Sequence, residues 1–86
     1  MGGVCVHAEN EGDAVIDGQK LLGDAIKRRR TKLGFTQRAF AAELDITAVH
    51  MCNVERGHAM PSFEMLLAIC VKLDVLPSKL FKEIGL

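Results

Sequence analysis

The chain has 86 residues and a mass of 9.4 kDa, which leaves room for one small domain and excludes a multi-domain enzyme. Hydrophobic residues make up 49% of it and Trp and Tyr are missing, so we expect a globular domain with an aliphatic core. The net charge of zero hides an asymmetry, because residues 1–19 hold four acids and no base, whereas residues 20–86 hold eleven bases and seven acids.

Residues 1–19 contain four glycines among polar residues. Such a segment buries too little apolar surface to offset the entropy lost on ordering, so we predict a flexible acidic N-terminal arm. No basic stretch precedes a long apolar run, as in a secretory signal, and no apolar run approaches the ~20 residues of a bilayer span. We therefore expect a cytoplasmic protein that makes no membrane contact.

The apolar pattern becomes helical after the arm. Apolar residues follow the 3.6-residue period from Leu22, and Gly34 suits a helix end, which predicts a first helix over residues 20–33. Thr36 is a good N-cap because its side-chain oxygen can accept from a backbone N–H of the first turn. A second helix is therefore expected over residues 37–44.

The spacing that follows is the most informative in the chain. Only residues 45–47 separate the second helix from a third, which Thr47 can cap and Gly57 can end, over residues 47–56. Two short helices joined so closely must cross at a large angle, with Ile46 filling the angle between them. The spacing predicts a helix-turn-helix unit.

Two further helices complete the expected domain. Ser62 can cap a helix over residues 63–73 that is apolar nearly all round, which predicts burial on both of its sides. Pro77 suits the first turn of a fifth helix over residues 77–84. We therefore predict an all-α, five-helix bundle over residues 20–86.

Asp45 and Asp74 each stand directly after an expected helix. Both follow a leucine and precede a β-branched residue, at the point where a helix needs a terminating residue of positive φ. Asp tolerates this conformation better than most other non-glycine residues. We predict the left-handed conformation at both positions.

Taken together, these features resemble the lambda-repressor/Cro-type (XRE-like) helix-turn-helix DNA-binding domains. The most specific features are Thr-Gln at the start of the second helix, Glu-x-Gly at the end of the third, and a later proline. The resemblance covers about three quarters of the chain and implies a lambda-repressor-like five-helix fold, binding to double-stranded DNA and, very often, a homodimer. The matching residues are Leu22, Gly23, Ile26, Arg30, 34–37, Phe40, Ala41, Ile46, Thr47, Met51, 54–57, Pro61, Leu66, Ile69, Leu73, Leu80 and Phe81.

The resemblance implies that the helix over residues 47–56 is the recognition helix and enters the major groove. Met51 and Val54 would point into the core. The remaining side chains form the expected groove-facing set, with His50 at its flank: Ala48, Val49, Cys52 and Asn53. Ala and Val can contact thymine methyl groups but cannot hydrogen-bond a base, so Asn53 is the candidate for reading adenine. The alternative is that this apolar surface binds a protein partner.

Further residues are expected along the phosphate backbone. The resemblance implies that Gln37 touches phosphate and braces the recognition helix, and Thr47 would combine its cap with a phosphate contact. Arg38, Arg56 and His58 would lie along the flanking phosphates and release counterions on binding. The alternative for each of these side chains is a solvated surface position.

Arg30 and Glu55 are not expected to contact DNA. Their equivalents in the family form a salt bridge that ties the first helix to the end of the third, which implies a structural role. The basic run over residues 27–32 spreads its charges around the first helix, so at most one or two of them can reach a duplex.

The fifth helix carries more apolar residues than a small core can bury, so some of them would be exposed on a monomer. The expected homodimer interface consists of Leu80, Phe81, Ile84 and Leu86. Pairing two copies would set two recognition helices about one DNA turn apart, ~34 Å, to match a palindromic operator. The alternative is that these residues only close the end of the bundle.

Nothing in the sequence indicates catalysis. It holds no Ser-His-Asp set with supporting motifs, no phosphate-binding glycine loop and no H-E-x-x-H motif. The three cysteines lack C-x-x-C spacing, and His50 and His58 have no third ligand in view, so we expect no metal site. We therefore expect neither an enzyme nor a cofactor nor a small-molecule ligand.

The expected function is that of a sequence-specific transcriptional regulator, a repressor, of bacterial, phage or plasmid origin. A second hypothesis is a protein-interaction module on the same fold, antitoxin-like or adaptor. A third is a thiol or metal sensor, which rests on an exposed Cys52. A dependence of affinity on salt would distinguish a duplex binder from a protein binder.

Overall fold

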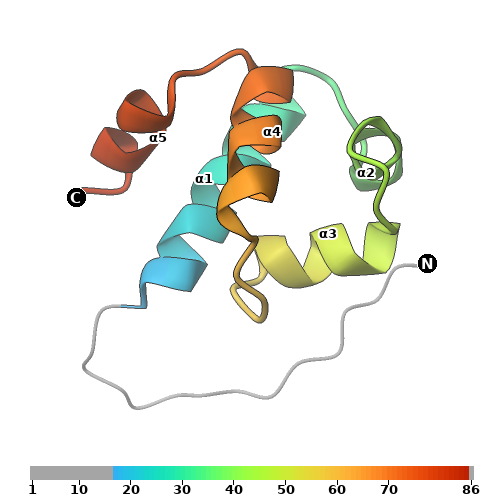
Figure 1. Ribbon diagram of the computed structural model, residues 1–86, viewed down its shortest axis with the longest axis horizontal. Helices are drawn as coiled ribbons and strands as arrows, with labels where there is room; N and C mark the ends of the chain where they lie inside the picture. Colours follow the sequence, from blue (N-terminus) through green and yellow to red (C-terminus); the bar gives the residue numbers. More distant parts are fainter. Residues whose placement is uncertain (1–16, 86) are drawn as a thin grey trace.

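The computed structural model describes residues 17–85, which form five α-helices and no strand within that range (Figure 1). The helices are α1 (Gly18–Lys32), α2 (Gln37–Glu43), α3 (Ala48–Glu55), α4 (Phe63–Leu73) and α5 (Pro77–Glu83). The prediction of an all-α, five-helix fold is confirmed. The predicted arm lies largely outside the described residues, and the two of its residues at positions 18 and 19 belong to α1.

Four of the five helices begin with the same side-chain cap. The side-chain oxygen of each cap accepts a hydrogen bond from the backbone N–H three residues later, at 3.0 to 3.2 Å, as Asp17, Thr36, Thr47 and Ser62 do. Each bond satisfies one of the backbone donors that a helix leaves free in its first turn. The caps predicted at Thr36, Thr47 and Ser62 are confirmed, and Asp17 starts α1 two residues earlier than expected.

Residues in the left-handed conformation, with positive φ, follow the first four helices. Gly34 (φ 87°) and Gly57 (φ 82°) follow α1 and α3, and Asp45 (φ 62°) and Asp74 (φ 59°) follow α2 and α4. The left-handed conformation predicted for both aspartates is therefore confirmed. Because the chain turns directly after each helix, the connections stay short and consecutive helices cross at an angle.

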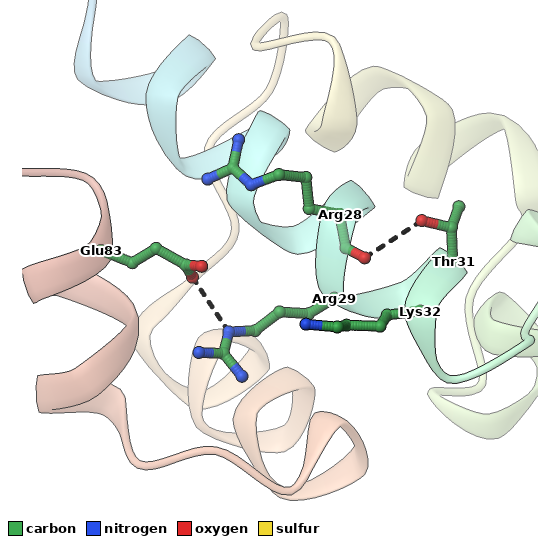
Figure 2. A pocket seen from close by; sticks show the side chains of 5 residues that line it. All are labelled: Arg28, Arg29, Thr31, Lys32 and Glu83. Carbon is green, nitrogen blue, oxygen red and sulfur yellow. Dashed lines mark hydrogen bonds and ion pairs between the residues drawn. The ribbon is translucent and has the colours of Figure 1, made fainter.

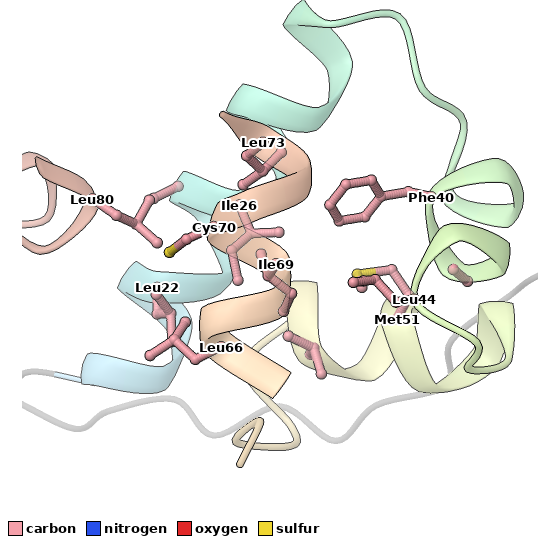
Figure 3. Close-up of a cluster of buried hydrophobic side chains, with 13 residues drawn as sticks. Leu22, Ile26, Phe40, Leu44, Met51, Leu66, Ile69, Cys70, Leu73 and Leu80 are labelled. Atoms are coloured by element: carbon pink, nitrogen blue, oxygen red, sulfur yellow. The ribbon is translucent and has the colours of Figure 1, made fainter. Parts of the chain in front are cut away.

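The core takes one fully buried side chain from every helix (Figure 3). Ile26, Phe40, Met51, Ile69 and Leu80 come from α1 to α5 in that order, and each has 0% of its surface exposed. The expectation that Leu80 faces a second copy is wrong, because its side chain fills the core of its own chain. Phe81 and Ile84 are partly buried against the same core, and Leu86 lies outside the described residues.

The outer side of α4 differs from the expectation. Its buried face consists of Leu66, Ile69, Cys70 and Leu73. Phe63, Leu67 and Val71 follow one another at four-residue intervals on the opposite face and are 73%, 37% and 74% exposed. The prediction of burial on both sides is wrong because no element within residues 17–85 covers this second face.

Cys70 lies in the core, as expected, at 2% exposure. Burial raises the pKa of the Cys70 thiol, and the positive charge of Arg29 opposes this shift only in part. No helix within residues 17–85 combines the length and the apolar character that crossing a bilayer requires.

Candidate nucleic-acid interface

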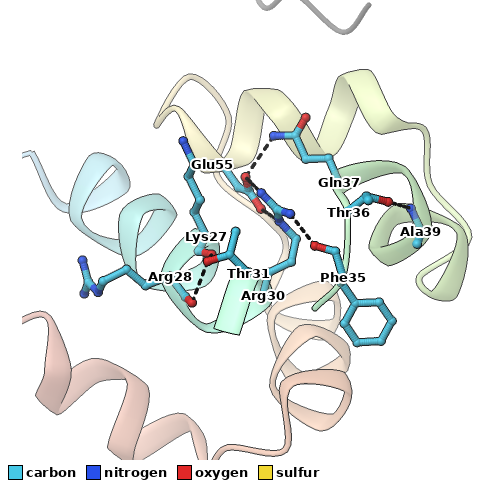
Figure 4. A network of polar contacts seen from close by, with 9 residues as sticks. All are labelled: Lys27, Arg28, Arg30, Thr31, Phe35, Thr36, Gln37, Ala39 and Glu55. Atoms are coloured by element: carbon cyan, nitrogen blue, oxygen red, sulfur yellow. Dashed lines mark hydrogen bonds and ion pairs between the residues drawn. The ribbon is translucent and has the colours of Figure 1, made fainter. Parts of the chain in front are cut away.

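A buried polar network holds the C-terminal end of α3 (Figure 4). Arg30 donates through Nε to Glu55 Oε2 at 2.6 Å and through Nη2 to Glu55 Oε1 at 3.1 Å, so the ion pair is bidentate. Gln37 Nε2 also donates to Glu55 Oε1, at 2.9 Å, and Arg30 Nη1 donates to the backbone oxygen of Phe35 at 2.7 Å. Three helices, α1, α2 and α3, thus meet at one carboxylate, and the loop after α1 joins the network through Arg30.

Both charges of the ion pair are removed from solvent. The side chains of Arg30 and Glu55 are 7% and 1% exposed. A buried charge is tolerated only when its partner and its remaining hydrogen-bonding atoms are satisfied. The contacts from Gln37 and to Phe35 supply those bonds, so the network fixes the orientation of α3 relative to α1 and α2.

Glycines let α1 approach the end of α3 closely. A Cβ at Gly23 would lie 2.4 Å from the backbone oxygen of Glu55 and 2.5 Å from that of Val54. A Cβ at Gly57 would lie 2.8 Å from Cα of Lys20. Since the obstructing atoms at both positions are backbone, no side-chain movement could relieve these contacts.

The opposite face of α3 points away from the bundle. Val49 is 61% exposed, and Ala48, His50 and Asn53 are partly exposed. Thr47, whose side-chain oxygen caps the helix, is exposed as well. The result is a short helix with a rigidly held inner face and an accessible outer face.

Polar and basic residues surround this outer face. Arg38, Arg56 and His58 are exposed, on α2 and directly after α3, whereas Gln37 is partly buried because its amide contacts Glu55. The bracing role expected for Gln37 is therefore visible, and its phosphate contact stays a prediction. Within residues 17–85 no three metal-ligating side chains come together.

A family model described as helix-turn-helix, HTH_3, matches residues 26–80, which is more than half of the chain. The chain belongs to the HTH_3 family. The resemblance to lambda-repressor/Cro-type (XRE-like) domains is thereby confirmed. The match spans all of α2, α3 and α4 together with the second half of α1, so it includes every segment that meets at Glu55.

Two regulatory proteins are among the solved structures similar to this HTH_3 chain. The restriction-modification controller protein C.AhdI from Aeromonas hydrophila is 26% identical with a TM-score of 0.72, over 77% of this chain and 100% of that one. The clp gene regulator ClgR from Corynebacterium glutamicum is 25% identical with a TM-score of 0.75, over 78% and 71% of the two chains. A second ClgR structure, at 22% identity and TM-score 0.78 over 88% and 95%, shows the shared fold alone. No curated protein sequence matches.

One prediction for the groove-facing set is wrong, because Cys52 is not exposed. Cys52 is only 5% exposed and lies on the inner face of α3. The buried positions of α3 are Met51, Cys52, Val54 and Glu55, so Cys52, about 100° around the helix from Met51, adjoins the buried arc. The exposed thiol on which the sensor hypothesis rests is therefore not found at this position.

Proposed function

We propose that the protein is a DNA-binding transcriptional regulator that inserts the outer face of α3 into the major groove of a duplex. The observation that carries this proposal is the outward presentation of α3 by a bundle that holds its inner face through the Arg30–Glu55–Gln37 network. Membership of the HTH_3 family and similarity to two regulators support it. A rigid presentation lets a few side chains meet base edges in a fixed register.

The outer face of α3 favours A·T-rich sequence. Val49 and Asn53 are four residues apart and share one side of the helix. Val49 and Ala48 offer methyl groups to thymine, and the amide of Asn53 can bond both N6 and N7 of adenine. We propose Asn53 as the residue that reads a base directly, with His50 at the edge of the contact.

The surrounding polar residues position the domain on the backbone. Arg38, Arg56 and His58 would neutralise phosphates on either side of the groove, and Thr47 and Gln37 would add hydrogen bonds from the helix starts. Such contacts supply affinity without sequence information and make binding depend on salt.

We further propose that a homodimer binds a palindromic operator and acts in the cytoplasm as a repressor, because a bound dimer excludes other proteins from the site. The exposed row of Phe63, Leu67 and Val71 on α4 supports pairing better than α5, whose Leu80 is internal. α3 lies beside the start of α4 (Figure 1). A two-fold axis running roughly along α4 would therefore keep both α3 helices on the same side.

The binding proposal is tested by selecting bound fragments from random duplexes and measuring their affinity over a series of salt concentrations. We expect an A·T-rich palindrome and a linear fall of log affinity with log salt. Duplexes that fail to associate even at low ionic strength would contradict the proposal.

The dimer is tested by sedimentation of the Phe63→Ser/Val71→Ser variant. We expect a folded monomer, because the variant removes two of the three apolar side chains of the exposed row on α4 and leaves the core unchanged. Lys82→Glu on the polar outside of α5 is the matched control and should stay dimeric. If the Phe63→Ser/Val71→Ser variant remains a dimer, α4 is not the interface.

A second candidate function is a protein-interaction module, antitoxin-like or adaptor, on the same fold. The 61% exposure of Val49, next to the apolar Ala48, favours it. Binding through such an apolar surface would change little with salt, so the same salt series separates the two functions.

A further inference from the structure

The last turns of α1 and Glu83 at the end of α5 border an open hollow of about 380 Å³ (Figure 2). Its lining consists of Arg28, Arg29, Thr31, Lys32 and Glu83. No residue of α2 or α3 lines it, so this α1–α5 cleft is separate from the proposed DNA interface.

The α1–α5 cleft carries an excess of positive charge. Glu83, its acidic lining residue, pairs with Arg29 through a 2.9 Å contact between Oε1 and Nε. Arg28 and Lys32 are exposed and have no ion-pair partner within residues 17–85. Figure 2 shows both side chains at the hollow, together with the Arg29–Glu83 pair.

The same imbalance extends to α1 and α5 as a whole. Within the described range, seven Lys and Arg side chains have no ion-pair partner: Lys27, Arg28, Lys32, Arg38, Arg56, Lys79 and Lys82. Five of the seven lie on α1 or α5, and only Arg38 and Arg56 lie on α2 or at the end of α3. Interaction with the C-terminal end of the dipole of its own helix can account for Lys32 on α1 and for Lys82 on α5, but not for Arg28 or Lys79. The DNA interface therefore leaves most of the unpaired positive charge without a role.

The spacing of these cations matches one class of anion. Arg28 and Lys32 are four residues apart, so they share a side of α1 at a separation of roughly 6 Å along its axis. In an extended peptide every second side chain lies on one side, roughly 7 Å apart. Carboxylates on alternate residues would therefore meet both cations at once.

We propose that the α1–α5 cleft binds an extended acidic peptide segment with carboxylates on alternate residues. This chain itself carries such a segment, with Glu9, Glu11 and Asp13 in alternation. Six residues connect Glu11 to Asp17 and can span up to about 20 Å, whereas α1 rises roughly 15 Å from its start to Arg28. Residues 9–13 of the same chain can thus reach the cleft, and they are its proposed occupant.

The test uses the full-length chain with Glu9→Gln, Glu11→Gln and Asp13→Asn, which removes the internal competitor. The probe is a fluorescein-labelled peptide of residues 8–14 (AENEGDA), and its amide analogue (AQNQGNA) is the control ligand. We expect fluorescence anisotropy to report binding of the acidic peptide alone, weakening as salt increases. Adding Arg28→Gln and Lys32→Gln should lower the affinity about tenfold, whereas Lys27→Gln, on α1 but outside the cleft, should not change it.

The unsubstituted chain identifies the source. Labelled peptide that binds it several-fold more weakly than it binds the neutralised chain assigns the cleft to the chain's own residues 9–13. Equal binding would overturn the assignment of residues 9–13 as the occupant, because a segment attached to the same chain should compete with added peptide of the same sequence. Circular dichroism of the variant with Arg28→Gln and Lys32→Gln verifies that it is folded. Absence of peptide binding to the neutralised chain, or binding unaffected by the cleft substitutions, would overturn the proposal, and neither result depends on DNA binding.

Discussion

On its inner face α3 places Met51, Val54 and Glu55, none of them more than 2% exposed, whereas on its outer face Val49 is 61% exposed. The inner residues meet two helices and a polar network, so their identity is dictated by neighbours that already exist within the chain. The outer residues have surroundings that only a partner can complete. Stability and specificity can therefore be changed separately in one helix of eight residues.

The largest effect is expected when the inner network loses one charge. Arg30→Met leaves the carboxylate of Glu55, whose side chain is 1% exposed, without its cation. We expect the free energy of unfolding, measured by urea titration, to fall by roughly 3–5 kcal/mol, the cost of an unpaired buried charge.

The double variant Arg30→Met/Glu55→Leu is the control for that loss. It removes both charges and should recover part of the stability, because only the hydrogen bonds of Gln37 and the Phe35 carbonyl remain broken. A single variant that loses less than about 1 kcal/mol would show that the network does not hold the inner face.

Gly23→Ala tests the same face through shape instead of charge. Its Cβ would meet two backbone oxygens of α3 at 2.4 and 2.5 Å, so the two helices must separate. We expect a loss of roughly 1–3 kcal/mol in unfolding free energy, typical of overpacking. Gly18→Ala on the same helix has open space around it and should be neutral or slightly stabilising. Equal urea midpoints for the two variants would contradict the close contact.

Local chemistry explains which parts of the fold the sequence could predict. The caps at Thr36, Thr47 and Ser62, and the positive φ at Asp45 and Asp74, depend on one residue and its immediate neighbours. They were accessible from spacing alone. The Arg30–Glu55 contact joins residues 25 positions apart, and only the family resemblance indicated it.

Packing explains what the sequence could not predict. The 5% exposure of Cys52 depends on its tertiary surroundings, which periodicity along a single helix does not reveal. Phe63 and Val71 are exposed although α4 is apolar nearly all round, because an apolar pattern does not supply an element to cover it. The role of Gly23 cannot be predicted from the sequence, because it consists of an absent side chain that only the facing backbone of α3 makes necessary.

Asn53→Ala changes the outer face and should leave the inner face intact. The backbone oxygen of Asn53, which accepts from His58 N at 2.9 Å, is retained, so unfolding free energy should move by less than about 0.5 kcal/mol. Affinity for the selected duplex should fall by roughly 1–3 kcal/mol, with relaxed preference for adenine at one position. A loss below about 1 kcal/mol with unchanged preference would remove Asn53 from base readout.

The smallest expected effect comes from Arg38→Gln, beside the outer face on α2. Arg38 is exposed and without an ion-pair partner within residues 17–85, so its removal breaks no internal contact of that kind and should not change unfolding. Losing one phosphate contact should make the slope of log affinity against log salt shallower by about 0.9, equally for selected and unrelated duplexes. Lys79→Gln on α5 removes the same charge away from α3 and should leave the slope unchanged. Equal slopes for the two variants would contradict a duplex placed against α3. They would show that removing one positive charge has the same effect on α2 as on α5.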